Sequence, residues 1–119
     1  MATALIIDDE IDICYLLSSI LRTKRFQVSY VNSLAEATVA LNIQQPEIIF
    51  LDNHLPDGLG VDFVKQLKLS HPTAKVVMIT AFDNYSDRSK AVKNGIDTFL
   101  SKPFTKDSIY QTIDKLLIA

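Results

Sequence analysis

Acidic residues follow two strongly apolar segments of this chain, and they are the side chains best suited to chemistry. Asp8 and Asp9 come directly after the apolar run 4–7, and Asp52 comes directly after the run 48–51. Two like unit charges about 4 Å apart repel by about 4 kcal/mol at the effective dielectric constant near a protein surface. If these carboxylates meet, the group therefore requires either a bound cation or a carboxyl group that stays protonated.

Mg²⁺ is the cation that matches this set of potential ligands. It binds carboxylate oxygens and usually keeps several water ligands, whose positions a phosphoryl oxygen can take. Mg²⁺ held by Asp52 and by Asp8 or Asp9 would neutralise charge on an incoming phosphoryl group. Asp52 could then act as the nucleophile of phosphoryl transfer and form an acyl phosphate.

A hydroxyl group and an ammonium group would complete the requirements of this reaction. Thr80 ends the apolar run 75–80, and Lys102 closely follows the short run 98–100. Lys102 is a point charge on a flexible stem and can pair with a phosphoryl oxygen. The Thr80 hydroxyl can donate a hydrogen bond to another phosphoryl oxygen.

Each of these residues, taken alone, has an ordinary structural explanation. Asp8 and Asp9 could cap a helix. Asp52 could cap a turn, and Lys102 could lie on the surface as most lysines do. The functional interpretation rests on their joint occurrence, because all of them would meet at one edge of the predicted sheet.

Short apolar segments alternate with longer amphipathic ones along the chain, and this alternation predicts strands separated by helices. The predicted strands are residues 4–7, 27–31, 48–51, 75–80 and 98–100. The predicted helices are residues 11–23, 33–42, 61–70, 83–94 and 106–118. Because the strands are almost entirely apolar, we expect an α/β fold with a doubly wound, five-stranded parallel sheet covered on both faces. The working crevice of such a sheet lies at the carboxyl ends of its strands.

Local signals refine three of the predicted helices. The buried face of the first helix is predicted from helical spacing to contain Ile13, Leu16, Leu17 and Ile20. The sequence SLAE at 33–36 fits a capping box at the start of the second helix. Gly95 predicts the end of helix 83–94, which is polar on most faces.

Composition limits the range of functions. Hydrophobic residues make up 48% of the 119 residues, enough for a core, and the formal net charge is −2. That charge gives no indication of a nucleic-acid-binding surface. The single cysteine, Cys14, excludes an intrachain disulfide, and the N-terminal apolar run is too short for a signal peptide or a membrane span. We expect one cytoplasmic domain over residues 1–119, with no direct contact to nucleic acid or membrane.

Four motifs give the sequence a resemblance to a known family. They are LIIDDE at 5–10, LDNHLPDGLG at 51–60, VMITA at 77–81 and LSKPF at 100–104. In this order and at this spacing the chain resembles, over essentially its whole length, the receiver domains of two-component response regulators. The resemblance implies the flavodoxin-like (βα)5 receiver fold.

The resemblance also implies roles for the acidic residues. Asp52 matches the phosphoacceptor of the family. Asp8 and Asp9 match the acidic pair that supports Mg²⁺, with Asp9 as the direct ligand. The backbone carbonyl of His54 matches a further metal ligand, and zinc binding by the His54 side chain is the rival interpretation.

Further positions match the switch of the family. Thr80 matches the switch hydroxyl, and Lys102 matches the phosphate-pairing lysine. Phe99 matches the switch aromatic, often a tyrosine, and without a hydroxyl group it would act through packing alone. The Lys102–Pro103 bond is expected to be cis, although only about 5–6% of X-Pro bonds are. Phe82 occupies a position through which the family tunes the lifetime of the phosphorylated form.

The resemblance implies partners as well. A phosphohistidine on a sensor histidine kinase or a histidine phosphotransfer protein would donate to Asp52, after which Thr80 would approach the acyl phosphate and Phe99 would rotate inward. These changes would act on a surface that binds an output domain, a target protein or a second copy in a phosphorylation-dependent dimer. That surface consists of residues 83–94, 98–100 and 106–118. We expect a switch rather than an enzyme, with at most slow self-phosphorylation from small donors and slow self-dephosphorylation.

Three other functions are weighed against this interpretation. A Mg²⁺-dependent phosphohydrolase with an aspartyl nucleophile usually has a second acid two positions after the nucleophile, where this chain has His54. A flavodoxin-like FMN protein would need a Ser/Thr/Gly-rich phosphate loop where Asp8 and Asp9 stand. A phosphorylation-independent interaction domain would not need the reactive residues.

Overall fold

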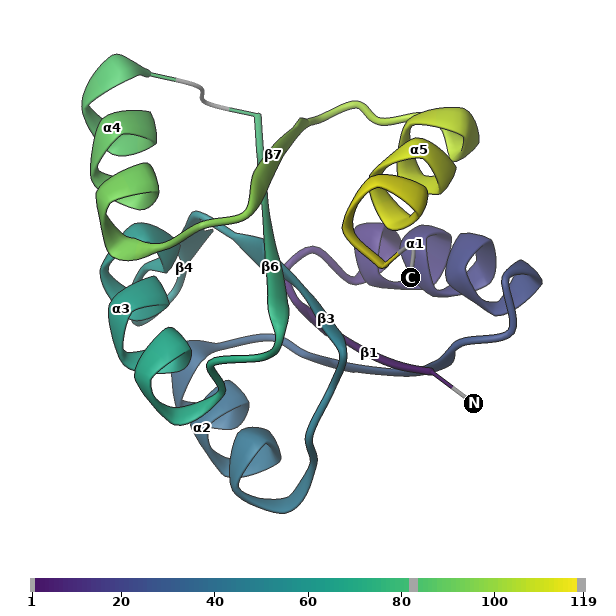
Figure 1. Ribbon diagram of the computed structural model, residues 1–119, viewed down its shortest axis with the longest axis horizontal. Coiled ribbons are helices and arrows are strands. Elements are labelled where there is room, and N and C mark those ends of the chain that lie inside the picture. The colour runs from purple at the N-terminus through teal and green to yellow at the C-terminus, as the bar shows by residue number, and fades with distance from the viewer. Residues whose placement is uncertain (1, 82–83, 118–119) are drawn as a thin grey trace.

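The apolar segments form strands of one sheet because their alternate side chains enter cores on opposite faces. The computed structural model describes residues 2–81 and 84–117. The strands of this sheet are β1 (Thr3–Ile7), β2 (Gln27–Val31), β3 (Ile48–Asp52), β6 (Lys75–Thr80) and β7 (Thr98–Ser101). Neighbouring strands are parallel, in the order β2-β1-β3-β6-β7 (Figure 1). The predicted doubly wound parallel sheet is therefore confirmed.

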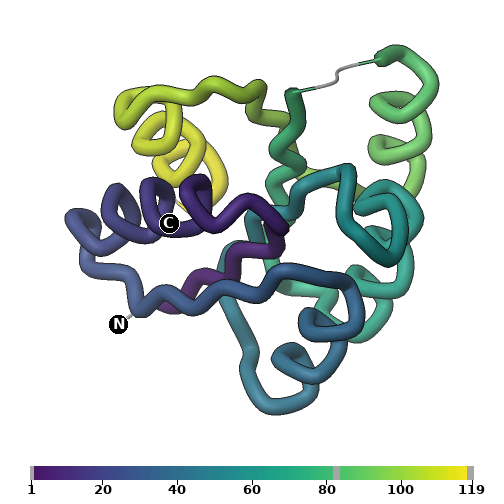
Figure 2. Tube along the Cα trace, turned by 180° about the vertical axis from the view of Figure 1, so that it is seen from behind, coloured from purple at the N-terminus to yellow at the C-terminus, as the bar shows by residue number. Residues whose placement is uncertain are grey.

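Helices within the described residues cover both faces of the sheet. They are α1 (Ile11–Thr23), α2 (Leu34–Ile43), α3 (Gly60–Ser70), α4 (Tyr85–Asn94) and α5 (Lys106–Leu117). Figures 1 and 2 show α1 and α5 together on one side, and α2, α3 and α4 on the other. The predicted start of a helix at Asp83 and end of another at Ile118 lie outside the described residues. None of the helices that the structure describes is both long and apolar enough to cross a membrane.

Two apolar cores hold these layers together, one on each face of the sheet. On the side of α2, α3 and α4, Leu5 of β1 and Leu51 of β3 are fully buried. On the side of α1 and α5, their neighbours Ile6 and Phe50 are fully buried against residues that include Leu17. Burying one such side chain contributes roughly 1.5–3 kcal/mol, so both faces fix the position of β1 and β3.

Two helix ends confirm the local signals in the sequence. The Ser33 hydroxyl accepts a hydrogen bond from the Glu36 N–H at 3.1 Å, as a capping residue does. The Glu36 carboxylate in turn accepts a hydrogen bond from the Asn32 N–H at 2.9 Å. Gly95 ends α4 with a φ of 108°, a left-handed conformation that favours glycine.

Two features differ from the prediction. Leu16 was expected on the buried face of α1 but is 50% exposed, and the fully buried apolar side chains of this helix include Cys14, Leu17 and Leu21. The reason is that the helix turns its Cys14 edge toward the sheet, which carries Leu16 outward. The segment expected as a turn before α3 contains a short antiparallel hairpin of β4 (His54–Leu55) and β5 (Gly58–Leu59).

Candidate functional site

The carboxyl ends of the central strands bring the predicted reactive residues to one edge of the sheet. β3 lies between β1 and β6, and Asp52 at its end pairs with Ile79, the residue before Thr80. Asp8 directly follows β1 on the other side of β3. Asp8 is fully buried, and Asp52 and Thr80 are 4% and 8% exposed. The backbone register therefore places two carboxyl groups and a hydroxyl group at neighbouring strand ends.

A compact group of carboxylates forms at this edge. One oxygen from each of Asp8, Asp9 and Asp52 can be chosen so that all three lie within 4.8 Å of one another. Asp9 is exposed, so the group opens toward solvent. The potential ligands that meet here within the described part of the chain are carboxylates, which suit Mg²⁺ or Ca²⁺ rather than zinc.

The two oxygens of the buried Asp8 carboxylate have different partners. Its Oδ1 accepts a hydrogen bond from the Glu10 N–H at 2.9 Å. Its Oδ2 is buried and accepts no well-directed hydrogen bond from the described residues, although it forms an ion pair with Lys102 Nζ at 2.9 Å. A buried carboxylate oxygen usually has a hydrogen-bond donor or a metal ion as its partner. Lys102 offsets part of the negative charge, and three carboxylates around one lysine still fit a divalent cation.

Lys102 reaches this group from the segment after β7. Its Nζ lies 2.9 Å from Asp8, 3.4 Å from Asp52 and 2.7 Å from Glu10. The sequence indicated that Lys102 would lie near Asp8 and Asp52. It did not indicate the contact with Glu10, although Glu10 continues the acidic run that begins at Asp8. The Lys102–Pro103 bond is cis, as the resemblance implied.

Burial and charge together set the ionisation of these groups. Burial, followed by the negative charge of Asp8, raises the pKa of Asp52 from 3.8 to about 6. Burial also raises the pKa of Asp8, against the opposing effects of the Glu10 N–H and Lys102. Burial alone would lower the pKa of Lys102, but its contacts with Glu10 and Asp8 raise it above the ordinary value. The lysine therefore stays charged at neutral pH, whereas the pKa of Asp52 lies at about 6.

A cleft of about 280 Å³ opens over the carboxylates and gives access to Asp52. It is lined by Asp9, Glu10, Asp52, His54, Ala81 and Lys102. The His54 side chain is exposed. This volume is several times the roughly 30 Å³ that one water molecule occupies in the liquid, so the cleft can admit a hydrated ion together with a small anionic group.

The two predicted switch residues lie on adjacent strands. Thr80 pairs with Ser101 across β6 and β7, and the Thr80 carbonyl accepts a hydrogen bond from the Lys102 N–H at 3.0 Å. Phe99 is partly buried and packs against the core under α2, α3 and α4. The Arg88 guanidinium of α4 lies 4.1 Å from the centre of the Phe99 ring. The prediction that Phe99 would depend on packing alone omitted this cation–π contact. Phe82 lies outside the described residues.

The loop after Asp52 is held by contacts that the sequence did not reveal. The Asp57 carboxylate accepts hydrogen bonds from the N–H groups of Leu34 and Ala35, both at 2.9 Å, and thereby caps α2 from the β4–β5 hairpin. These two bonds lower the pKa of Asp57. At Gly60 a Cβ atom would lie 2.4 Å from the Asp52 carbonyl oxygen, so only glycine allows α3 to begin so close to β3. The sequence indicated a turn at Asp57 and Gly60. It did not indicate which groups these two residues contact.

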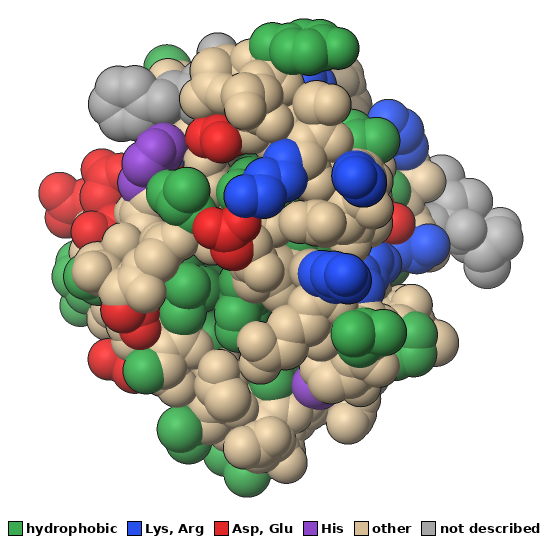
Figure 3. All heavy atoms as spheres, turned by 90° about the vertical axis from the view of Figure 1, so that its left-hand side faces the viewer, with side chains coloured by type: hydrophobic (Ala, Val, Ile, Leu, Met, Phe, Trp, Pro, Cys, Tyr) green, Lys and Arg blue, Asp and Glu red, His purple; other side chains and the backbone are tan. Residues whose placement is uncertain are grey.

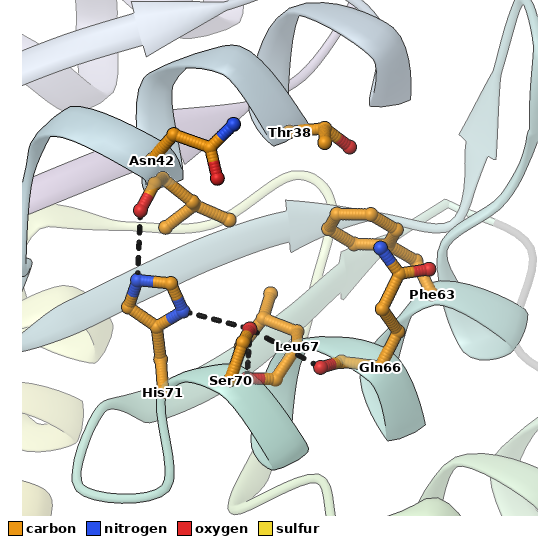
Figure 4. Close-up of a pocket in the computed structure, with 8 residues that line it drawn as sticks. Thr38, Asn42, Phe63, Gln66, Leu67, Ser70 and His71 are labelled. Carbon is orange, nitrogen blue, oxygen red and sulfur yellow. Dashed lines mark hydrogen bonds between the residues drawn. The ribbon is translucent and has the colours of Figure 1, made fainter.

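A second, smaller hollow lies between α2 and α3 (Figure 4). Its volume is about 120 Å³, and His71 lies at its edge. The two ring nitrogens of His71 contact the Leu41 carbonyl at 3.0 Å and the Ser70 hydroxyl at 2.9 Å. The contact with Leu41 holds the end of α3 to α2 and the contact with Ser70 fixes the ring, so this histidine has a structural role.

Comparisons with known proteins agree with the fold and the acidic edge. The family model for the response regulator receiver domain matches residues 4–114. The probable transcriptional regulatory protein TcrX of Mycobacterium tuberculosis is 30% identical over 115 residues, which cover 97% of this chain and 49% of TcrX. The chain thus spans about half the length of that relative.

Solved structures show the same architecture. A two-component response regulator from Clostridium difficile superposes with a TM-score of 0.94 at 26% identity, covering 98% of this chain and 96% of that one. A response regulator from Burkholderia pseudomallei, described with a phosphorylated aspartic acid and a calcium ion, has a TM-score of 0.89 at 25% identity. The match covers 99% of this chain and 68% of that one.

Proposed function

The chain belongs to the response regulator receiver domain family of two-component signalling, and on that premise we propose that Asp52 is its phosphoacceptor. One observation carries the proposal: Asp52 ends the central strand, within 4.8 Å of two further carboxylates and 3.4 Å from the ammonium group of Lys102. Among the described residues, Asp52 is the carboxylate that lines the cleft at a buried strand end. Asp52 is therefore accessible from the cleft and lies beside the carboxylates and the ammonium group that phosphoryl transfer requires.

In the proposed reaction, a carboxylate oxygen of Asp52 attacks the phosphorus atom of a phosphohistidine on the donor protein. The P–N bond breaks, and the released imidazole takes a proton. Asp52 must be ionised to attack, and with a pKa of about 6 in the metal-free protein it is mostly ionised at neutral pH. Lys102 lies where it can pair with an oxygen of the transferred group.

We assign Mg²⁺ to the carboxylate group at this edge. The ligands would be Asp8, Asp9 and Asp52, together with the backbone carbonyl of His54. Bound there, Mg²⁺ would neutralise charge on the phosphoryl oxygens. The three carboxylates that converge here and the calcium ion described for the Burkholderia relative support a divalent cation.

The switch that we propose uses Thr80 and Phe99. The Thr80 hydroxyl donates a hydrogen bond to the phosphoryl group, and Phe99 fills the space that Thr80 leaves. Phe99 is partly buried already and carries Arg88 on its ring, so its movement would act directly on α4. The surface of α4, β7 and α5 then changes its affinity for a partner.

Receiver domains of response regulators work with histidine kinases and output domains, and we propose the same for this chain. A sensor histidine kinase or a histidine phosphotransfer protein would be the donor. An output domain, a target protein or a second phosphorylated copy would read the switched surface. We further propose that residues 1–119 fold as one receiver domain, and that the protein acts in the cytoplasm as a switch rather than as a turnover enzyme.

Mass spectrometry of the intact protein tests this assignment. Incubation with acetyl phosphate and Mg²⁺ should add one phosphoryl group to the wild type and none to Asp52→Asn. Thr80→Ala should be labelled as fully as the wild type, because its hydroxyl group acts after transfer. Labelling of Asp52→Asn would refute the phosphoacceptor, and loss of labelling in Thr80→Ala would refute the separate switch role. Rapid turnover of a phosphomonoester would favour the phosphohydrolase alternative.

A further inference from the structure

Asn53, the residue after the proposed phosphoacceptor, has a buried side chain that the proposed chemistry does not use. It is 1% exposed, and both ends of its amide are engaged. Its Oδ1 accepts a hydrogen bond from the Val61 N–H at 3.0 Å, and its Nδ2 donates one to Asp87 Oδ2 at 3.0 Å. Val61 is in the first turn of α3 and Asp87 in the first turn of α4. One side chain beside Asp52 therefore contacts the starts of two helices.

Asp87 joins this contact to the cap of α4. Its N–H donates to Asn84 Oδ1 at 2.8 Å, and its Oδ2 accepts from Asn84 Nδ2 at 3.1 Å. The oxygen that accepts from Asn53 is thus also the one that completes the cap. A change in the position of Asn53 therefore alters a hydrogen bond in the first turn of α4.

Apart from the Arg88–Phe99 contact, α4 packs mainly against α3 and buries little of its side-chain surface. Ala91 is the only buried residue of α4. Basic side chains gather on the face of the molecule that carries α3 and α4 (Figure 3). The ion pair between Lys90 and Asp62 is about half exposed, and such pairs contribute little to stability. The Asn94 side chain also donates to the Val61 carbonyl at 2.8 Å, at the far end of the helix. Of these polar contacts, the bond between Asn53 and Asp87 is charge-assisted and has a fully buried partner, so it should be strong.

The backbone between Asp52 and Asn53 is packed tightly against α3. The Gly60 N–H donates to the Asn53 carbonyl at 2.8 Å, and a Cβ atom at Gly60 would lie 2.4 Å from the Asp52 carbonyl oxygen. A phosphoryl group adds bulk and negative charge to the residue whose peptide bond leads into Asn53. The backbone has little room to absorb a shift there without moving the Asn53 side chain.

We propose that the hydrogen bond between Asn53 and Asp87 is a latch that holds the first turn of α4 until Asp52 is phosphorylated. This inference rests on the proposed function of Asp52 and adds a second route from that residue to α4, separate from Thr80 and Phe99. In the unphosphorylated protein the latch is closed. Phosphorylation displaces Asn53, opens the latch and frees the start of α4.

Amide hydrogen exchange of residues 85–92, measured with and without acetyl phosphate and Mg²⁺, tests the latch. In the wild type, phosphorylation should accelerate this exchange. Asp87→Ala should accelerate it about tenfold without phosphorylation, as expected for loss of one charge-assisted hydrogen bond. Phosphorylation should then add less than about twofold in Asp87→Ala, because the latch is already open. Asn53→Ala, which leaves the Asn84 cap intact, should give the same result.

Two variants serve as matched controls. Asn84→Ala weakens the cap but keeps the bond to Asn53, and Lys90→Ala removes only the exposed ion pair. Both should keep the wild-type acceleration on phosphorylation. If Asp87→Ala also keeps it, or if the wild type shows none, the latch is refuted. Intact masses of the same samples separate the two proposals, because a wild type that gains no phosphoryl group overturns the proposed function and the latch with it.

Discussion

At the scale of single residues, the surroundings of Asp52 impose a free-energy cost on its ionisation. Its side chain is almost completely buried, and burial and Asp8 raise its pKa from 3.8 to about 6. Between these two pH values the folded protein holds a proton that the unfolded chain has lost. The free energy of unfolding therefore falls as the pH rises from about 4 to about 6, and the cost is fully present above that range. A shift of about two units corresponds to a cost on the order of 3 kcal/mol.

Asp52→Asn should therefore stabilise the metal-free protein at pH 8, by up to about 3 kcal/mol, because the amide cannot ionise. The gain should shrink as the pH falls through 6 and should vanish near pH 4. Urea unfolding of both proteins in EDTA at pH 8, 6 and 4 measures the difference. A gain that stays the same at all three pH values would show that the charge of Asp52 is not its cause.

The sequence allowed several residues of the site to be placed, for a simple physical reason. Parallel strands end at the same edge, so the sequence alone assigns Asp8, Asp52 and Thr80 to one crevice. The ion pair of Lys102 with Glu10 joins residues 92 positions apart and could not be deduced from either strand. Asn53 looks in the sequence like an ordinary turn residue, because its role depends on where α4 packs.

At the scale of elements, α1 shows where periodicity alone is insufficient. Helical spacing is satisfied by Ile13, Leu16, Leu17 and Ile20, but also by the apolar residues that the structure buries: Cys14, Leu17, Ile20 and Leu21. The two sets differ by a small rotation of the helix about its axis. Only packing against the sheet and α5 selects one of them, so the element was predictable and its exact face was not.

Leu17→Ala and Leu16→Ala test which face of α1 is buried. The two variants make the same chemical change at adjacent residues. Leu17 is fully buried, so its truncation should leave a cavity and lower the free energy of unfolding by about 2–5 kcal/mol. Leu16 is half exposed, so the same change there should cost less than about 1 kcal/mol. Urea denaturation at one pH gives both values. Similar losses in the two variants would contradict the orientation of α1.

At the scale of the whole molecule, the fold separates stability from chemistry. The two apolar cores lie on the faces of the sheet, whereas the charged groups collect at the carboxyl edge. The overall charge is only −2, so the strong local field at this edge does not appear in the composition. It arises because folding gathers acids that are 44 positions apart in the chain, Asp8 and Asp52, beside one lysine.

This gathering predicts that Mg²⁺ stabilises the folded protein. Unfolding separates Asp52 from Asp8 and Asp9, so the ion binds the native state preferentially. An ion at 100 times its Kd then adds about 2.7 kcal/mol to the free energy of unfolding. Thermal unfolding should show a Tm that rises with Mg²⁺ concentration and returns to its starting value with EDTA.

Asp9→Asn should remove most of the rise in Tm, because Asp9 supplies one of the three converging oxygens. Asp12→Asn is the matched control: it makes the same change of charge at an exposed residue in the first turn of α1, outside the carboxylate group. Asp12→Asn should therefore keep the wild-type response. Equal losses in the two variants would mean that Mg²⁺ acts by general screening of negative charge. A loss confined to Asp9→Asn would locate the ion at the carboxylate group of Asp8, Asp9 and Asp52.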